Sequence, residues 1–279
     1  MNEKRIFING GASGLGRALA ERYARAGWRV CIGDLDEARC AETMAALHGG
    51  AASHALRCDV TREEDLAAAA EWLRAHWGGV DVVVNNAGVA QEGTIVDTPL
   101  SDWQWIVDIN LLGVVRGCKV FTPMMRAQGS GHLVNIASMA GLIHPPRSSA
   151  YNATQAAVVA LSETLQLELG DSGIDVSVVC PAYFRTNLAT NARTTDSVSA
   201  NMVSKLVGRA RHTAAEIAEL VYRGIERSDF HILTHPDAKM MWLMKRFLPF
   251  SLYLASMRRQ LRRGEQRARR RNIQQGQMS

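Results

Sequence analysis

Seven short runs of apolar and β-branched residues alternate with longer segments of helical period between residues 5 and 234. Strand, helix and strand at this spacing predict βαβ units, and hence an α/β fold with a parallel sheet covered by helices on both faces. The central runs are almost continuously apolar, as strands buried on both faces require. The predicted strands span residues 5–9, 29–34, 54–59, 80–86, 131–138, 175–181 and 229–234, and the helical segments between the first six span 14–27, 36–49, 61–78, 101–128 and 150–173.

The chain is predicted to hold one domain and one extension. No repeat or linker interrupts residues 1–235, and residues 236–279 form a C-terminal amphipathic and basic extension. The five cysteines are scattered without a CxxC pair or a Cys/His ligand spacing, which predicts reduced thiols in a cytoplasmic protein and no metal site. The start, MNEKRIFINGG, lacks the pattern of a secretory signal, and no run of about 18 apolar residues predicts a membrane span.

Positive charge is concentrated in the extension. The net charge of the chain is +5, yet residues 236–279 hold eleven Lys and Arg against Asp237 and Glu265, which is +9 and leaves −4 for the remainder. The basic balance therefore does not indicate a nucleic-acid-binding domain, and no nucleic-acid partner is expected. Apolar residues cluster on both sides of Pro249 ahead of the arginines. This pattern leaves two roles open: a helix that packs over a cleft or a partner subunit, or a peripheral anchor on an anionic membrane surface.

A glycine-rich turn joins the first predicted strand to the first helix. In INGGASGLG, Gly10, Gly14 and Gly16 allow a tight turn and the close approach of backbone to a pyrophosphate group at the helix N-terminus. Asp34 ends the second strand, where a carboxylate can accept hydrogen bonds from adenosine ribose hydroxyls and repel a 2′-phosphate. These features predict a dinucleotide site that favours NAD over NADP. The alternative for Asp34 is a cap on the following helix.

Further motifs follow in a fixed order: the Gly-x-x-x-Gly-x-Gly spacing of the turn, CDV at 58–60, NNAG at 85–88, INLLG with Asn110, NIASMAG with Ser138, and YNATQ starting at Tyr151. Jointly they resemble the short-chain dehydrogenase/reductase family over residues 4 to about 235. The resemblance implies a single Rossmann-like, doubly wound domain with a seven-stranded parallel sheet. It also implies a nicotinamide-dependent oxidoreductase that assembles as a homodimer or homotetramer.

The resemblance also assigns roles to individual residues. Ser138 would hydrogen-bond the substrate oxygen, Tyr151 would be the acid/base, and Asn110 would hold a water that relays protons. The predicted cofactor-binding residues are Gly10, Ser13, Gly14, Leu15 and Gly16 for the diphosphate, Asp34 for the ribose, Asp59 and Val60 for the adenine, Asn86, Ala87 and Gly88 for the cofactor floor, Pro181, Phe184 and Thr186 for the nicotinamide pocket, and Tyr151 and Gln155 beside them.

The role of Tyr151 also follows from its chemistry. Hydride transfer between an alcohol and a nicotinamide needs a group that exchanges the hydroxyl proton of the substrate. Tyr151 begins a helix, follows the loop HPPRSSA, and is predicted to face the strand that carries Ser138. A buried phenol on a core helix is the plain alternative.

Three residues depart from the family pattern: Asn9 for threonine, Ala182 for glycine and Gln155 for lysine. The amide of Gln155 can still bind ribose hydroxyls, but it carries no charge. A phenol with a pKa near 10 is only about 0.1% ionised at pH 7. A cation a few Å away would contribute about 3–4 kcal/mol at an effective dielectric constant of about 20, or roughly two to three pK units.

Three outcomes stay open for a site without that cation. The positive nicotinamide could partly substitute for it and leave a slow enzyme with an alkaline optimum for alcohol oxidation. Tyr151 could act in carbonyl reduction, where it only donates a proton. Catalysis could also be lost, which would leave a protein that binds cofactor or ligand. The predicted function is an NAD(H)-dependent oxidoreductase acting on a secondary alcohol or its ketone, with the silent binding protein as the alternative.

The substrate is predicted to be hydrophobic. Residues 185–208 are rich in Ser, Thr and Asn, as in a flexible lid. Met139, Ile143, Tyr183 and Leu188 are expected to form an apolar pocket, which suits a hydrophobic alcohol or ketone better than a polyol.

Overall fold

The computed structural model describes residues 3–47, 52–186, 192–196, 207–208 and 210–259. By its internal contacts the chain divides into two compact units, Met1–His235 and Pro236–Ser279. In the second unit, α10 spans Pro236–Phe247. No helix in the described ranges is both long and apolar enough to cross a membrane.

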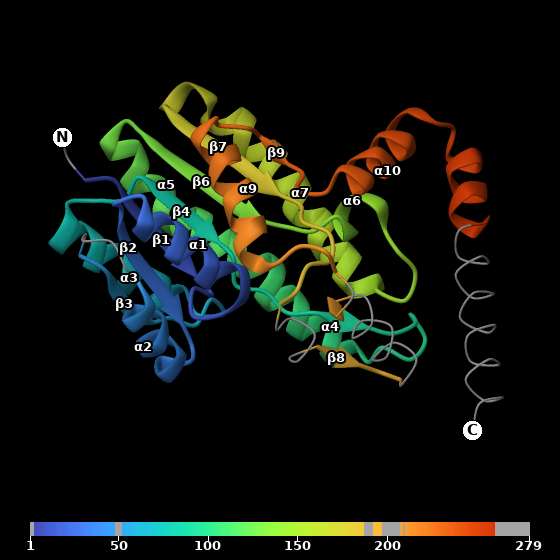
Figure 1. Ribbon diagram of the computed structural model, residues 1–279, viewed down its shortest axis with the longest axis horizontal. Helices are drawn as coiled ribbons and strands as arrows, with labels where there is room; N and C mark the ends of the chain where they lie inside the picture. Colours follow the sequence, from blue (N-terminus) through green and yellow to red (C-terminus); the bar gives the residue numbers. More distant parts are fainter. Residues whose placement is uncertain (1–2, 48–51, 187–191, 197–206, 209, 260–279) are drawn as a thin grey trace. The chain divides into compact units, whose positions relative to one another are not determined.

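The first unit is built on a seven-stranded sheet in the order β3-β2-β1-β4-β6-β7-β9 (Figure 1). Every neighbouring pair is parallel. The predicted α/β doubly wound fold with seven parallel strands is therefore confirmed. The strands are β1 (Arg5–Asn9), β2 (Arg29–Asp34), β3 (His54–Arg57), β4 (Val82–Asn85), β6 (Gly131–Ile136), β7 (Ile174–Val179) and β9 (His231–Ile232).

Helices cover both faces of this sheet (Figure 1). On one face, Ile6 and Ile8 of β1 belong to a core cluster that also takes residues from α1, α2 and α9. On the other face, Phe7 packs against Phe121 of α5 with ring centroids 5.1 Å apart. The helices are α1 (Gly14–Arg25), α2 (Glu37–Ala46), α3 (Glu63–Trp77), α4 (Leu100–Val107), α5 (Gly113–Gln128), α6 (Ala140–Ile143), α7 (Ser149–Leu169) and α9 (Ala214–Glu226).

Three features differ from the predicted elements. The predicted helix over 101–128 contains a π-helical turn at Asp108–Leu112 between α4 and α5. Helices α6 and α9 were not among the predicted helices, although α9 starts at a capping box formed by Thr213 and Glu216. Two short strands, β5 (Gln91–Glu92) and β8 (Arg193–Thr194), form a small parallel sheet of their own.

Gly16 is required by close packing in the glycine-rich turn. A Cβ at this position would lie 2.1 Å from the carbonyl oxygen of Gly10. We expect Gly16→Ala to lower the free energy of unfolding by about 1–3 kcal/mol or more, because backbone would have to move. Gly170→Ala is the control, since a Cβ there meets nothing within 4 Å and the change should stay within about ±1 kcal/mol. Urea denaturation of both variants checks this, and equal stability loss would contradict it.

Candidate functional site

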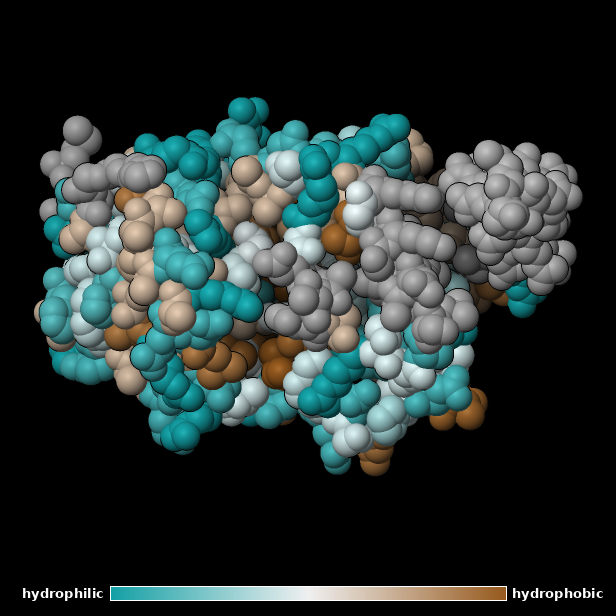
Figure 2. Space-filling view, turned by 60° about the horizontal axis from the view of Figure 1, so that its bottom comes forward, coloured by the Kyte–Doolittle hydropathy of each residue, from teal (hydrophilic) through white to brown (hydrophobic). Residues whose placement is uncertain are grey.

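A cavity of about 640 Å³ opens at the carboxyl ends of the parallel strands, where ligands bind in open α/β sheets. On the face shown in Figure 2, hydrophobic side chains in brown gather near the centre, whereas hydrophilic ones dominate the upper and left margins. Of the predicted site residues, Gly16 and Asn110 do not line the cavity. Those that do are Gly10, Ser13, Gly14, Leu15, Asp34, Asp59, Val60, Asn86, Ala87, Gly88, Ser138, Tyr151, Gln155, Pro181, Phe184 and Thr186.

The glycine-rich turn is fixed by Asn9 at the end of β1. Its side-chain oxygen accepts hydrogen bonds from the backbone N–H groups of Asn86 and Ala87, both at 2.8 Å. Its side-chain nitrogen donates to Oδ1 of Asn85 at 2.9 Å. Asn86 in turn donates from its side chain to the carbonyl of Gly10 at 2.8 Å, and Gly10 has a positive φ of 64°. The side chain of Asn9 thus joins the turn to the end of β4.

Asp34 holds the other side of this turn. Its carboxylate accepts from the backbone N–H of Ala12 at 3.0 Å and from that of Asp36 at 3.2 Å. The cap of α2 is Asp36, whose side chain accepts from the backbone N–H of Arg39. The interpretation of Asp34 as the helix cap is therefore wrong. Arg39, which the sequence analysis did not single out, lines the same cavity and pairs with Asp36 at 3.1 Å.

Ser138 and Tyr151 meet in the cavity. Ser138 follows β6, and Tyr151 lies in the first turn of α7. Burial raises the pKa of Tyr151 to about 12, and a hydrogen bond with Ser138 opposes this rise. The hydroxyl of Ser138 also accepts from the backbone N–H of Ala140 at 3.1 Å. At neutral pH Tyr151 is therefore a protonated phenol held beside a fixed hydroxyl group.

Gln155 presents an unsatisfied acceptor. It lies one helical turn after Tyr151, lines the cavity and is only 5% exposed. Its side-chain oxygen has no hydrogen-bond donor among the described residues. A buried acceptor left without a donor costs about 1–3 kcal/mol. A ligand hydroxyl in the cavity would supply the missing donor, so this residue fits a ribose-bearing cofactor.

Asn110 lies in the π-helical turn and is buried. Its side-chain oxygen accepts from the backbone N–H of Val89 at 2.8 Å, and its nitrogen donates to the carbonyl of Val89 at 2.9 Å. Its side chain therefore fixes the segment that follows the NNAG motif. The predicted role in holding a relay water stays a prediction.

The predicted substrate pocket is matched in part. Met139, Ile143 and Tyr183 line the cavity. Leu188 and most of the predicted lid lie outside the described residues.

The sequence analysis missed Glu92. This residue of β5 lines the cavity, is buried, and accepts a hydrogen bond from the hydroxyl of Ser148. Burial raises its pKa to about 7. In sequence it is one carboxylate in a loop, where most such groups are solvated, and only the pairing of β5 with β8 could have indicated its burial.

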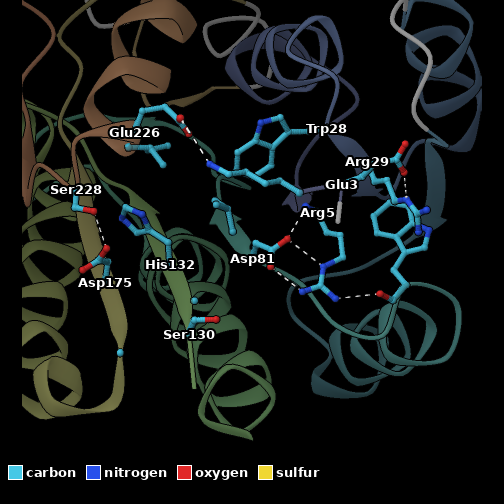
Figure 3. Close-up of a pocket in the computed structure, with 16 residues that line it drawn as sticks. Glu3, Arg5, Trp28, Arg29, Asp81, Ser130, His132, Asp175, Glu226 and Ser228 are labelled. Carbon is cyan, nitrogen blue, oxygen red and sulfur yellow. Dashed lines mark hydrogen bonds and ion pairs between the residues drawn. The ribbon is translucent and has the colours of Figure 1, made fainter. Parts of the chain in front are cut away.

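A second hollow, of about 630 Å³, lies near the starts of the strands (Figure 3). Most of its charges are paired. Arg5 bonds Asp81 at 2.7 Å, and the side chains of Lys4 and Glu226 lie 3.8 Å apart. It lacks the features of a dinucleotide site. Within the described part of the chain, no group of three or more His, Cys, Asp or Glu side chains is arranged to hold a metal ion.

Comparison with known proteins agrees with this geometry. Residues 4–197 match the profile of the family described as short chain dehydrogenase. The putative oxidoreductase SadH of Mycobacterium tuberculosis is 33% identical over 250 residues, covering 88% of this chain and 91% of that protein. A short chain dehydrogenase/reductase from Burkholderia phymatum in complex with NAD has a TM-score of 0.84 at 33% identity, covering 88% of this chain and 93% of that one. A short-chain dehydrogenase from Sphingobium yanoikuyae in complex with NADPH has a TM-score of 0.74 at 31% identity, covering 86% and 92%.

Proposed function

The chain belongs to the short-chain dehydrogenase/reductase family of oxidoreductases, and from this premise we propose that it is an NAD(H)-dependent enzyme that interconverts a hydrophobic secondary alcohol and its ketone. The observation that carries the proposal is the meeting of Ser138 and Tyr151 in the cavity that the glycine-rich turn also lines. The test is NAD-linked turnover, followed by NADH absorbance over a panel of hydrophobic secondary alcohols and ketones. Absence of turnover with every compound, by a protein that binds NAD, would support the binding-protein alternative below.

The cofactor would lie along the carboxyl ends of β1, β2 and β4. The turn at Gly10 to Leu15 would hold its diphosphate, Asp34 its adenosine ribose, and Gln155 its nicotinamide ribose. Asp59 and Val60 would flank the adenine, and Phe184 and Thr186 the nicotinamide. When bound, this cofactor supplies the hydride donor or acceptor.

Tyr151 would move the proton at the reacting oxygen, and Ser138 would orient that oxygen by a hydrogen bond. A phenol whose pKa is raised to about 12 is fully protonated at neutral pH. It is therefore ready to donate a proton to a carbonyl oxygen during reduction. Removing a proton from an alcohol is harder, because the phenolate needed as a base is scarce.

Gln155 stands where we infer that most relatives carry a lysine. An amide cannot stabilise the Tyr151 phenolate by charge. The proposed enzyme should therefore favour carbonyl reduction at neutral pH and alcohol oxidation at alkaline pH. The same residue supports a second candidate function, a catalytically impaired or silent protein of this fold that binds cofactor or ligand. The two candidates differ in turnover and not in cofactor binding.

We propose NAD as the cofactor because the Asp34 carboxylate would lie close to the 2′-phosphate of NADP and repel it. NAD lacks this phosphate. Two like charges about 4 Å apart repel by about 4 kcal/mol per charge pair at an effective dielectric constant of about 20. We expect Asp34→Asn to raise the ratio of kcat/KM with NADP to that with NAD by about tenfold or more. Steady-state kinetics with both cofactors measure this ratio.

Arg39 provides the matched control for this prediction, since it lines the same cavity as Asp34. Adding Arg39→Ala to Asp34→Asn should remove most of the gain with NADP, because the guanidinium is then absent as a phosphate partner. An unchanged cofactor ratio in Asp34→Asn would contradict the role of Asp34.

We further propose a cytoplasmic homodimer or homotetramer, as expected for this family. For the extension, a packing role and a peripheral contact with an anionic membrane both remain proposals. The arginines of residues 260–279 lie outside the described residues.

A further inference from the structure

One buried carboxyl group in the cavity has no part in the chemistry proposed above. Glu92 is 4% exposed and lines the cavity together with Ser138, Tyr151 and Tyr183. A carboxyl group buried among apolar side chains is costly unless it is paired or hydrogen-bonded. The apolar members of the same lining include Val89, Ala90, Trp105, Ile109, Met139, Ile143 and Pro145.

The surroundings of Glu92 leave its carboxyl group only partly satisfied. Oε2 accepts the hydroxyl hydrogen of Ser148. No other hydrogen bond or ion pair to this side chain occurs within the described ranges. The guanidinium of Arg147, whose charge acts on Glu92, pairs with Asp196 at 2.5 Å. Its charge lowers the pKa of Glu92 from a distance, but burial outweighs that effect and the pKa rises to about 7.

The backbone fixes Glu92 in place. Strand β5 pairs with β8, and Glu92 stands opposite Thr194. The next residue, Gly93, bridges to Ser148, and its N–H donates to the carbonyl of Arg147 at 2.8 Å. Glu92 is thus held by two neighbouring segments, which is the arrangement expected of a group that must meet a ligand in one geometry.

We propose that Glu92 determines specificity by binding a second hydroxyl group of the substrate, so that the preferred substrates are diols or hydroxyketones with an otherwise apolar skeleton. This inference rests on the proposed function and narrows its substrate class. A hydroxyl group both donates and accepts, and a carboxyl group can complement it whether the carboxyl is ionised or protonated. An ammonium group fits less well, because Arg147 places a positive charge nearby.

A purely structural role for Glu92 makes a different prediction. Ser148 is the N-cap residue of α7, yet its hydroxyl does not cap the helix and donates to Glu92 instead. If Glu92 only anchored the helix that carries Tyr151, Ser148→Ala would reproduce the effect of altering Glu92. If Glu92 binds substrate, Ser148→Ala keeps the carboxyl group and the preference for a second hydroxyl.

The experiment compares cyclohexanol with the 1,2-, 1,3- and 1,4-cyclohexanediols in the presence of NAD. In the unmodified protein we expect kcat/KM for at least one diol to exceed that for cyclohexanol by about tenfold or more, beyond the twofold statistical factor. Glu92→Leu should abolish this preference or reverse it, Glu92→Gln should retain part of it, and Ser148→Ala should retain it.

Calorimetric binding of the same compounds to the Tyr151→Phe protein with NAD separates this inference from the proposed function. A diol preference that Glu92→Leu removes there supports the inference, even if the unmodified protein shows no turnover. Equal affinity for cyclohexanol and every diol overturns it, as does tighter binding of 4-aminocyclohexanol than of any diol. If Glu92→Leu and Ser148→Ala lower the diol preference equally, the inference is overturned in favour of the anchoring role. Failure of all these compounds to bind a protein that binds NAD also overturns the inference.

Discussion

Tyr151→Phe is expected to lower NAD-linked turnover by about 10²–10⁴-fold, the usual contribution of a positioned general acid or base. The variant lacks the phenolic hydrogen that Tyr151 would transfer, and it also lacks the hydrogen bond with Ser138. Phenylalanine keeps the ring, so the packing of α7 should change little and the affinity for NAD should fall far less than turnover. Measurements of kcat, KM and the NAD dissociation constant separate a loss of chemistry from a loss of binding.

Tyr183→Phe is the matched control for this result. Tyr183 is a second phenol in the same cavity, and burial raises its pKa as well. Its removal should act mainly on KM, because we assign it to the substrate pocket and not to proton transfer. A large loss of kcat in Tyr183→Phe with little change in Tyr151→Phe would overturn the assignment of Tyr151 as the acid/base.

The fold could be predicted because its pattern is local and repeated. The central strands contain runs such as RIFIN and RVCIGD whose apolar residues are buried on both faces of the sheet, whereas the edge strand β3 is only partly buried. The motif residues were also predictable as a group, because the carboxyl ends of parallel strands meet at one edge of a sheet. Gly10, which follows β1, and Asn86, which follows β4, are therefore neighbours, although 76 residues separate them.

What the sequence did not indicate depends on tertiary contacts. Glu92 becomes a buried cavity residue because β5 pairs with β8, two segments that are distant in sequence and only two residues long. Likewise, no pattern in INLLG shows that the side chain of Asn110 is bonded to Val89. The helix-cap alternative for Asp34 was excluded by one hydrogen bond, in which Asp36 and not Asp34 accepts from the backbone of Arg39, and the role of Asp34 at the ribose stays a prediction.

Gln155→Lys is expected to move the alkaline limb of alcohol oxidation down by about two to three pH units, because an ammonium group a few Å from the phenolate lowers the pKa of Tyr151. Burial of the lysine opposes this effect, so the shift should be nearer two pH units than three if the ammonium is strongly desolvated. At pH 7 the rate of alcohol oxidation should rise about 100-fold, since the phenolate fraction rises tenfold for each unit by which the pKa falls. In the pH dependence of kcat/KM between about pH 6 and 10.5, the unmodified protein should still be rising at the upper end, whereas Gln155→Lys should reach its plateau within this range.

The control is Gln155→Met, which has a similar length but brings neither charge nor a strong acceptor. It should weaken NAD binding without moving the alkaline limb, because the ribose of the cofactor would lose the amide of Gln155 as a partner while the charge near Tyr151 stays zero. A limb that moves equally in both variants would mean that the amide, and not the missing charge, sets the pKa of Tyr151.

Turnover by the unmodified protein tells the two candidate functions apart. Lysine stabilises the phenolate, which is the starting form of the base in oxidation and the product of the acid in reduction. If Gln155 belongs to a working reductase, the unmodified protein should already reduce ketones at pH 7, and Gln155→Lys should raise the rates in both directions, because an enzyme cannot change the equilibrium between alcohol and ketone. If the unmodified protein is silent in both directions and only Gln155→Lys turns over, the loss of one charge is enough to explain the silence. The native site, with its intact Ser138, Tyr151 and glycine-rich turn, would then serve to bind cofactor or ligand without converting it.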